Sequence, residues 1–146
     1  MDTKHTPIDE KQLQDAKSTT HGSAALTIER NGVIESIEAR TYGFSSWDGY
    51  SHEYPNGDFL AGRFDYAQDL PTGRHVREVP ELRAYLNDRD DVDYGPGYLT
   101  AGKLTVEVER SGQYFKHDVV VEDVTFVHAG NTVIINGNLS VSSDDD

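Results

Sequence analysis

Hydrophobic and polar residues alternate along the last third of the chain. Leu104, Val106 and Val108 alternate with polar or charged residues from Lys103 to Glu109. A period of two residues is typical of a strand that has one face in the core and the other in water. Further strands are predicted over Tyr114–Glu122, Val124–Val127 and Thr132–Val141, with turns at Ser111-Gly112 and Ala129-Gly130-Asn131. The pattern therefore predicts three or four consecutive antiparallel strands.

The first half of the chain predicts a β-hairpin followed by an aromatic segment. Residues 24–39 contain Asn31-Gly32, a pair suited to a type I′ turn, with Val33–Ala39 as the returning strand. Residues 41–56 are rich in glycine, serine and aromatic side chains, which predicts an irregular strand and a long loop. A turn over 55–58 then leads into a strand, Phe59–Tyr66.

Two segments predict short helices. In Pro80–Arg89 the proline suits a first turn, and Leu82, Tyr85 and Leu86 follow helical spacing. Near the N-terminus, Thr6-Pro7-Ile8-Asp9 predicts a capped helix that reaches about residue 17. Its apolar stripe is thin, so we expect this region to become ordered only against a partner.

These elements predict a mainly β fold. We expect two packed antiparallel sheets that form a barrel or sandwich, with one short flanking α-helix and an N-terminal arm. The 146 residues are divided into an arm over 1–23, a single β-rich domain over 24–143 and an acidic tail over 144–146. The chain has no cysteine, no apolar run long enough to span a bilayer and no secretory signal.

The chain is strongly acidic. It has 26 acidic and 13 basic residues, which gives a formal net charge of −13. Such a surface repels phosphate and argues against sequence-independent nucleic-acid binding. Two interpretations remain: ordinary acidic solubility, and an origin in a salt-rich cytoplasm, which we favour slightly.

Candidate chemistry is sparse. Residues 97–103 have the glycine and lysine spacing of a phosphate-binding loop, but Leu104 replaces the required Ser or Thr and a strand follows. The six histidines are scattered, and no serine lies in a Gly-x-Ser-x-Gly elbow. The carboxylates over Asp88–Asp93 do not fit a calcium loop, so a solvated helix end is favoured over a weak cation site at a subunit contact. We therefore predict no enzyme and no cofactor; a hydrolase with paired carboxylates is the third-ranked hypothesis.

One aromatic cluster is the best candidate for binding. It consists of Tyr42, Phe44, Trp47, Tyr50 and Tyr54. Such side chains stack on sugars or fill a pocket of a partner. The alternative, which we favour, is that they cap one end of a barrel.

With this order of elements, the chain resembles the tail tube proteins of contractile-tailed bacteriophages and related viruses. The resemblance begins at Gly22–Ile28 and continues through the hairpin. It then includes a short helix, here Glu81–Leu86, and closing strands like Tyr114–Thr125 and Val133–Val141. The aromatic loop and the acidity depart from the family. Adaptation to high salt would explain the acidity, and the loop leaves room for a tube-end or other virion component.

The resemblance implies a virion structural protein, assembled in the host cytoplasm and located in the tail. Six-fold homo-oligomeric rings would stack into a hollow tube through which DNA passes without specific binding. Its partners would be copies of itself and sheath or other tail proteins, with no membrane. The arm, including Ile8 and Leu13, and the aromatic loop would form ring-to-ring contacts. The alternative function is a soluble β-sandwich binding module with Tyr42–Tyr54 as its ligand site.

Overall fold

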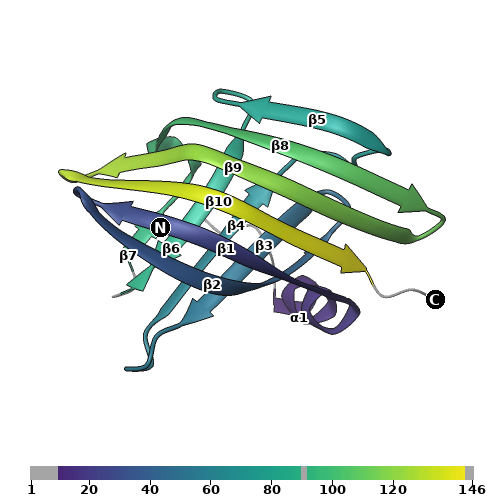
Figure 1. The fold of residues 1–146 in the computed structure, drawn as a ribbon, viewed down its shortest axis with the longest axis horizontal. Helices are drawn as coiled ribbons and strands as arrows, with labels where there is room; N and C mark the ends of the chain where they lie inside the picture. The colour runs from purple at the N-terminus through teal and green to yellow at the C-terminus, as the bar shows by residue number, and fades with distance from the viewer. Residues whose placement is uncertain (1–9, 90–91, 144–146) are drawn as a thin grey trace.

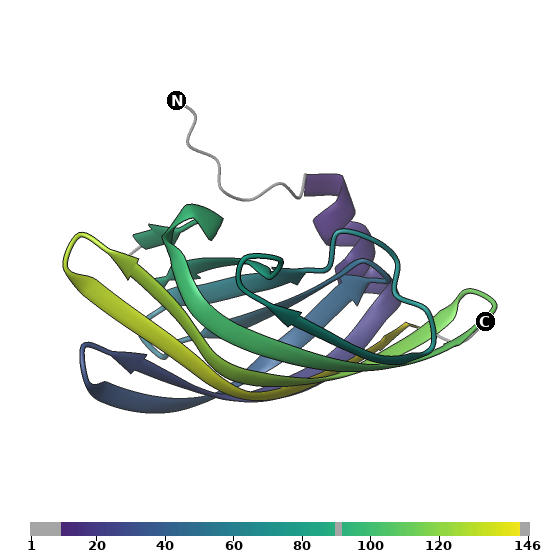
Figure 2. The same cartoon turned by 90° about the horizontal axis from the view of Figure 1, so that it is seen from above.

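The computed structural model describes residues 10–89 and 92–143, which form one sheet of ten antiparallel strands curled into a half-barrel (Figures 1 and 2). The order across the sheet is β5-β8-β9-β10-β1-β2-β3-β4-β6-β7. The elements are α1 (Glu10–Thr19), β1 (Thr20–Arg30), β2 (Val33–Phe44), β3 (Trp47–Glu53), β4 (Phe59–Asp65), β5 (Gly73–Glu78), β6 (Arg83–Asp88), β7 (Val92–Tyr94), the 3₁₀ helix η2 (Pro96–Tyr98), β8 (Leu99–Ser111), β9 (Tyr114–His128) and β10 (Asn131–Ser143).

The predicted mainly β, antiparallel architecture is confirmed, with one correction to the number of sheets. The two expected layers are the two halves of a single sheet, because β1 pairs with β10 on one side and with β2 on the other. Figure 2 shows the sheet curling so that its halves face each other. Their inward side chains form one continuous apolar core, so curling achieves the burial expected of a sandwich.

The hairpin and the C-terminal strands lie where the alternation predicts them. Asn31 (φ 51°) and Gly32 (φ 89°) form the turn between β1 and β2, and both have the positive φ of a type I′ turn. Strands β8, β9 and β10 pair consecutively. The predicted unit Val124–Val127 belongs to β9, which continues through Asp123 (φ 51°).

A β-bulge helps to bend this half of the sheet. The register between β9 and β10 shifts between Ile135 and Gly137, and Gly137 has φ 135°. A Cβ atom at Gly137 would lie 2.1 Å from the Ala25 carbonyl oxygen, so only glycine fits here. The extra residue lies in β9, where Glu122 and Asp123 stand opposite Asn136 alone, and the Asp123 N–H donates a hydrogen bond to the Asn136 Oδ1 atom (2.8 Å). Bulges of this kind increase local twist and permit a sheet to curl.

The predicted helix over Pro80–Arg89 is wrong. Residues 83–88 form β6, which pairs with β4 and β7. Leu82, Tyr85 and Leu86 are all buried, although Tyr85 and Leu86 lie on opposite faces of the strand. Burial on both faces removed the alternation that identifies a strand, and pairing with distant segments overrode local helix propensity.

The flanking helix is instead α1, in the region where a short helix was predicted. It contacts β1 and β2 at one end of the half-barrel (Figure 1). The strand that follows begins at Thr20, so the predicted arm boundary at residue 23 falls inside β1. Residues 1–9 and 144–146 lie outside the described residues. No helix in the described part of the chain is long and apolar enough to cross a membrane.

Candidate functional site

The aromatic segment is a β-hairpin, and its side chains point mainly into the protein. Strands β2 and β3 are joined at Ser45-Ser46, so the predicted long loop is wrong. Tyr42, Trp47, Tyr50 and Tyr54 are buried, and Phe44 is half-buried. Four of the five rings are therefore largely enclosed, and Phe44 alone is partly open to solvent.

Trp47 is enclosed by neighbours from its own hairpin and from α1. Its ring lies 5.1 Å from that of Phe44 and 6.3 Å from that of Tyr42, both edge to face. Ala16 of α1 packs into the same cluster. Edge-to-face pairs of this kind stabilise a packed cluster. The favoured interpretation of this segment, a cap on one end of the β domain, agrees with this packing.

Arg63 of β4 lies beside this cluster. Its guanidinium carbon is 4.3 Å from the Tyr85 ring centroid and 5.9 Å from that of Trp47. Its Nη2 atom pairs with the Asp65 carboxylate at 3.2 Å, and its buried Nε has no hydrogen-bond partner. Burial lowers the pKa of Arg63. The aromatic faces that could recognise a cationic ligand are thus already in contact with a cation of the chain itself.

A buried polar cluster joins the two halves of the half-barrel. Asp48 of β3 accepts a hydrogen bond from Tyr66 (2.8 Å) and contacts Nδ1 of His117 in β9 (2.8 and 3.0 Å). Burial raises the pKa of Asp48, although its hydrogen bonds oppose the shift. Burial also raises the pKa of Tyr66.

In this cluster the Asp48 carboxylate lies against one ring nitrogen of His117, which is the arrangement by which a carboxylate orients an imidazole. The remaining ring nitrogen, Nε2 of His117, is buried and has no hydrogen-bond partner. His117 and Asp48 are fully buried, so a substrate does not reach this nitrogen in this structure. The cluster was not predicted, because its members lie up to 69 residues apart and form no motif.

Arg30 organises a second network at the other end of the sheet. Its Nε and Nη2 atoms donate to the two carboxylate oxygens of Asp88, each at 2.8 Å, and its Nη1 donates to Glu35 at 2.8 Å. Tyr54 is bonded to both Arg30 and Glu35, at 3.0 Å each. Burial pushes the pKa of Glu35 upward, but the bonds from Arg30 and Tyr54 outweigh it and hold this pKa below its usual value. The network ties the β1–β2 hairpin to β6.

The carboxylates from Asp88 to Asp93 do not form the predicted solvated helix end. Asp88 is buried at the end of β6 and is bonded to Arg30, while Asp93 of β7 accepts a hydrogen bond from Asn87 (2.6 Å). Asp90 and Asp91 lie outside the described residues. Within residues 10–89 and 92–143, no group of three acidic or histidine side chains could hold a metal.

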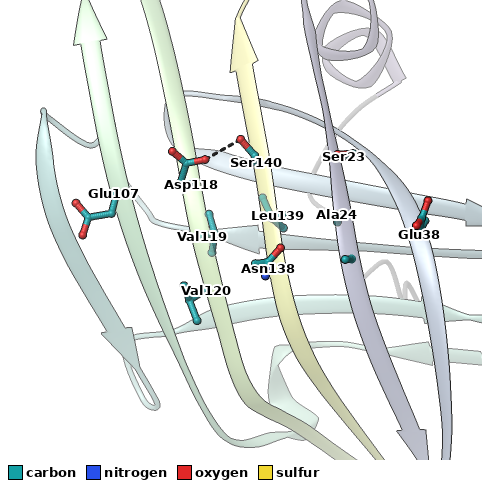
Figure 3. Close-up of a pocket in the computed structure, with 11 residues that line it drawn as sticks. Ser23, Ala24, Glu38, Glu107, Asp118, Val119, Val120, Asn138, Leu139 and Ser140 are labelled. Carbon is teal, nitrogen blue, oxygen red and sulfur yellow. Dashed lines mark hydrogen bonds between the residues drawn. The ribbon is translucent and has the colours of Figure 1, made fainter.

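A shallow pocket lies on the outer face of β8, β9, β10, β1 and β2 (Figure 3). Small side chains form its floor, among them Ser23, Ala25 and Ser140. Glu107 and Asp118 border one side and Glu38 the other, and Ser140 donates a 2.7 Å hydrogen bond to Asp118. The acidic border is unfavourable for phosphate groups, as the sequence predicted.

The outer margin of the sheet is the remaining candidate, and it is formed by β5 (Figure 1). Thr72 directly precedes β5, and its hydroxyl is hydrogen-bonded to Arg110 near the end of β8. The hydroxyl accepts from the Arg110 N–H and donates to the Arg110 carbonyl. Backbone groups alternate in direction along a strand. The backbone groups of Val108, Val106 and Leu104 in β8 therefore also face β5. The β5 partners of these residues are Gly73, His75 and Arg77.

The intervening residues of β5 therefore point their backbone groups away from the sheet. These residues are Arg74, Val76 and Glu78. The Val76 carbonyl oxygen accepts a hydrogen bond from the guanidinium of Arg77, its own neighbour, at 3.2 Å. A row of outward N–H and C=O groups is a template for pairing with another strand.

The remaining predictions concern two residues of the arm and the segment with phosphate-loop spacing. Ile8 lies outside the described residues, and Leu13 lies within α1. Residues 97–103 run from η2 into β8, so the expected strand follows and no helix opens there. No family model, curated protein or solved structure matches the chain. The candidate function therefore depends on the geometry of the sheet and on the predictions made from the sequence.

Proposed function

We propose that this protein is a non-catalytic structural subunit that associates with copies of itself by extending its sheet. The observation that carries the proposal is the open margin at β5, where the backbone groups of three residues face away from β8 and no further strand pairs with them. Natural proteins cover or distort such edges when they remain monomeric, and subunits that assemble pair them.

The proposal gives the tail-tube resemblance a physical basis. Tail tube subunits are expected to join their sheets to those of neighbours, and an open ten-stranded half-barrel leaves strand margins, at β5 and β7, that are available for such contacts. A tube subunit of a virion is thus the specific form of the proposal. Its surroundings would be other tail proteins, with DNA passing through without specific contacts.

The charge of the chain makes this association dependent on salt. At a net charge of −13, subunits repel one another at low ionic strength. Salt shortens the range of this repulsion to about 3 Å at 1 M. We therefore expect larger assemblies at multimolar salt than at low salt.

Electron microscopy of the purified full-length protein at low and at multimolar salt tests the proposal. Rings or stacked tubes are expected, and light scattering on the same samples gives their mass. Uniform monomers at both salts would contradict it.

The variant Val76→Pro tests whether the edge of β5 carries the contact. Proline removes an N–H that points away from the sheet, so the pairing of β5 with β8 is retained. We expect this variant to lose its assemblies while its circular dichroism spectrum stays unchanged. Val76→Thr, which keeps the N–H, should still assemble. Assemblies of Val76→Pro that match those of the natural chain would exclude β5 as the contact.

A further inference from the structure

The edge of β5 carries a charge pattern that is complementary to itself. Arg74 and Glu78 lie two residues to either side of Val76, and all three side chains are on the exposed face of the strand. Val76 is 44% exposed. A cation and an anion placed symmetrically about a centre match a second copy that runs in the opposite direction.

We propose that two copies of the chain pair through β5 in an antiparallel arrangement, with a two-fold axis at Val76. Val76 then faces its counterpart, and Arg74 of each copy faces Glu78 of the other. The partner is thus a second copy of this chain, and the inference rests on the proposed self-association and names its contact.

The backbone of β5 is suited to this register. Arg74, Val76 and Glu78 are the residues whose N–H and C=O groups point outward. The facing Val76 residues therefore exchange both of their backbone hydrogen bonds across the axis. In each Arg74–Glu78 pair, the Glu78 carbonyl already accepts from the Leu82 N–H (2.8 Å) and accepts the bond from Arg74 with its second lone pair. The Val76 carbonyl, which now accepts from Arg77, accepts instead from the Val76 N–H of the second copy.

Other registers and directions of pairing at this edge form fewer pairs of opposite charge. A shift by two residues places Arg74 or Glu78 opposite Val76, and a parallel in-register pairing places like charges opposite each other. Like charges that face each other across strands are destabilising. A head-to-tail contact would have to use β7, which spans only Val92–Tyr94. The charge pattern therefore selects the two-fold register and disfavours the alternatives.

The inner face of the strand permits the same pairing. There His75 stands opposite Arg77 of the second copy. The His75 ring is held by its own chain, with Nε2 2.8 Å from the Pro71 carbonyl oxygen. A two-fold contact at β5 closes on itself as a dimer, so a ring built from such dimers would need a second contact elsewhere on the subunit.

A single introduced cysteine tests the axis. The chain has no cysteine, so Val76→Cys places its only thiol where the two copies meet. Directly paired residues in antiparallel strands have Cα atoms about 5.5 Å apart, which is within disulfide range. We expect mild oxidation to give a covalent dimer from full-length Val76→Cys. The matched control is Val120→Cys in β9, which is 47% exposed and should stay monomeric.

Two outcomes of this experiment would overturn the inference. One is crosslinking of Val76→Cys that is no faster than that of Val120→Cys. The other is a Val76→Cys, Val92→Cys double variant that crosslinks 76 to 92 while Val76→Cys alone does not. That result would indicate a head-to-tail contact between β5 and β7, and the proposed self-association would survive it.

A charge exchange tests the register independently. Arg74→Glu and Glu78→Arg each place like charges opposite each other twice in the dimer, so each should weaken dimerisation about tenfold or more. The double variant restores both pairs and should return to within about threefold of the natural chain. Arg74 also pairs with Glu107 of β8 at 2.6 Å, so Glu107→Gln controls for that contact and should leave dimerisation unchanged. A double variant no better than either single variant would overturn the proposed register.

Discussion

At the scale of single residues, the least expected feature is the Asp48–Tyr66–His117 cluster inside the core. A carboxylate without solvent contact is costly unless hydrogen bonds satisfy it, and here two side chains bond it. It lies between strands from opposite halves of the sheet, so it fixes how the halves face each other. We therefore assign the cluster a structural role.

The raised pKa of Asp48 predicts a pH dependence of stability. A carboxyl whose pKa is raised in the folded state favours folding below its ordinary value, and this contribution is lost as the pH rises through the folded value. The free energy of unfolding of the natural chain, minus that of Asp48→Asn, should therefore increase as the pH falls from 7 towards the ordinary aspartate range. Urea titrations at several pH values measure this difference. A difference that is constant or decreases would show that Asp48 does not titrate in this way.

Substitution of Trp47 tests whether its ring is a packed core side chain or a platform for a ligand. Because its ring is buried among Phe44, Tyr42 and Ala16, Trp47→Ala should lower the free energy of unfolding by about 4 kcal/mol. Phe59→Ala is the control, since Phe59 is 55% exposed and should cost less than about 0.5 kcal/mol. Urea denaturation measures both. Equal stability of the two variants would reopen the interpretation of Trp47 as a ligand platform.

At the scale of elements, the sequence predicts strands well where one face is buried and poorly where both are. The turn at Asn31-Gly32 and the C-terminal strands β8, β9 and β10 follow from turn residues and alternation. Strand β6 was missed, because Tyr85 and Leu86 are both buried and imitate a helical stripe. The contact between Asp48 and His117 depends on the curl of the whole sheet, so no local pattern could reveal it.

The contact between Arg30 and Asp88 predicts how firmly the β1–β2 hairpin is held to β6. Both side chains are largely buried, so Asp88→Ala removes the bidentate partner of the Arg30 guanidinium, leaves Glu35 as its remaining carboxylate, and should cost about 3 kcal/mol. Glu107→Ala removes one partner of the exposed pair with Arg74 and should cost less than about 1 kcal/mol. Urea denaturation again measures both, and similar costs would show that the Arg30 network adds no more than a surface pair.

At the scale of the whole molecule, the half-barrel combines a closed core with an open margin. The core needs no partner, since its apolar side chains are buried by the curl of the sheet. The margin at β5 has outward backbone groups and charges arranged symmetrically about Val76. Fold stability and assembly are thus assigned to different parts of the protein, so edge variants should affect one without the other.

Self-association through β5 is the central claim, and the mass of the protein in solution tests it most directly. Light scattering during size-exclusion chromatography should give masses above the 16.3 kDa of one chain, rising with protein concentration and with salt. Val76→Pro should remain at one chain under the same conditions. A mass of 16.3 kDa for the natural chain at every concentration, at both low and multimolar salt, would contradict the claim.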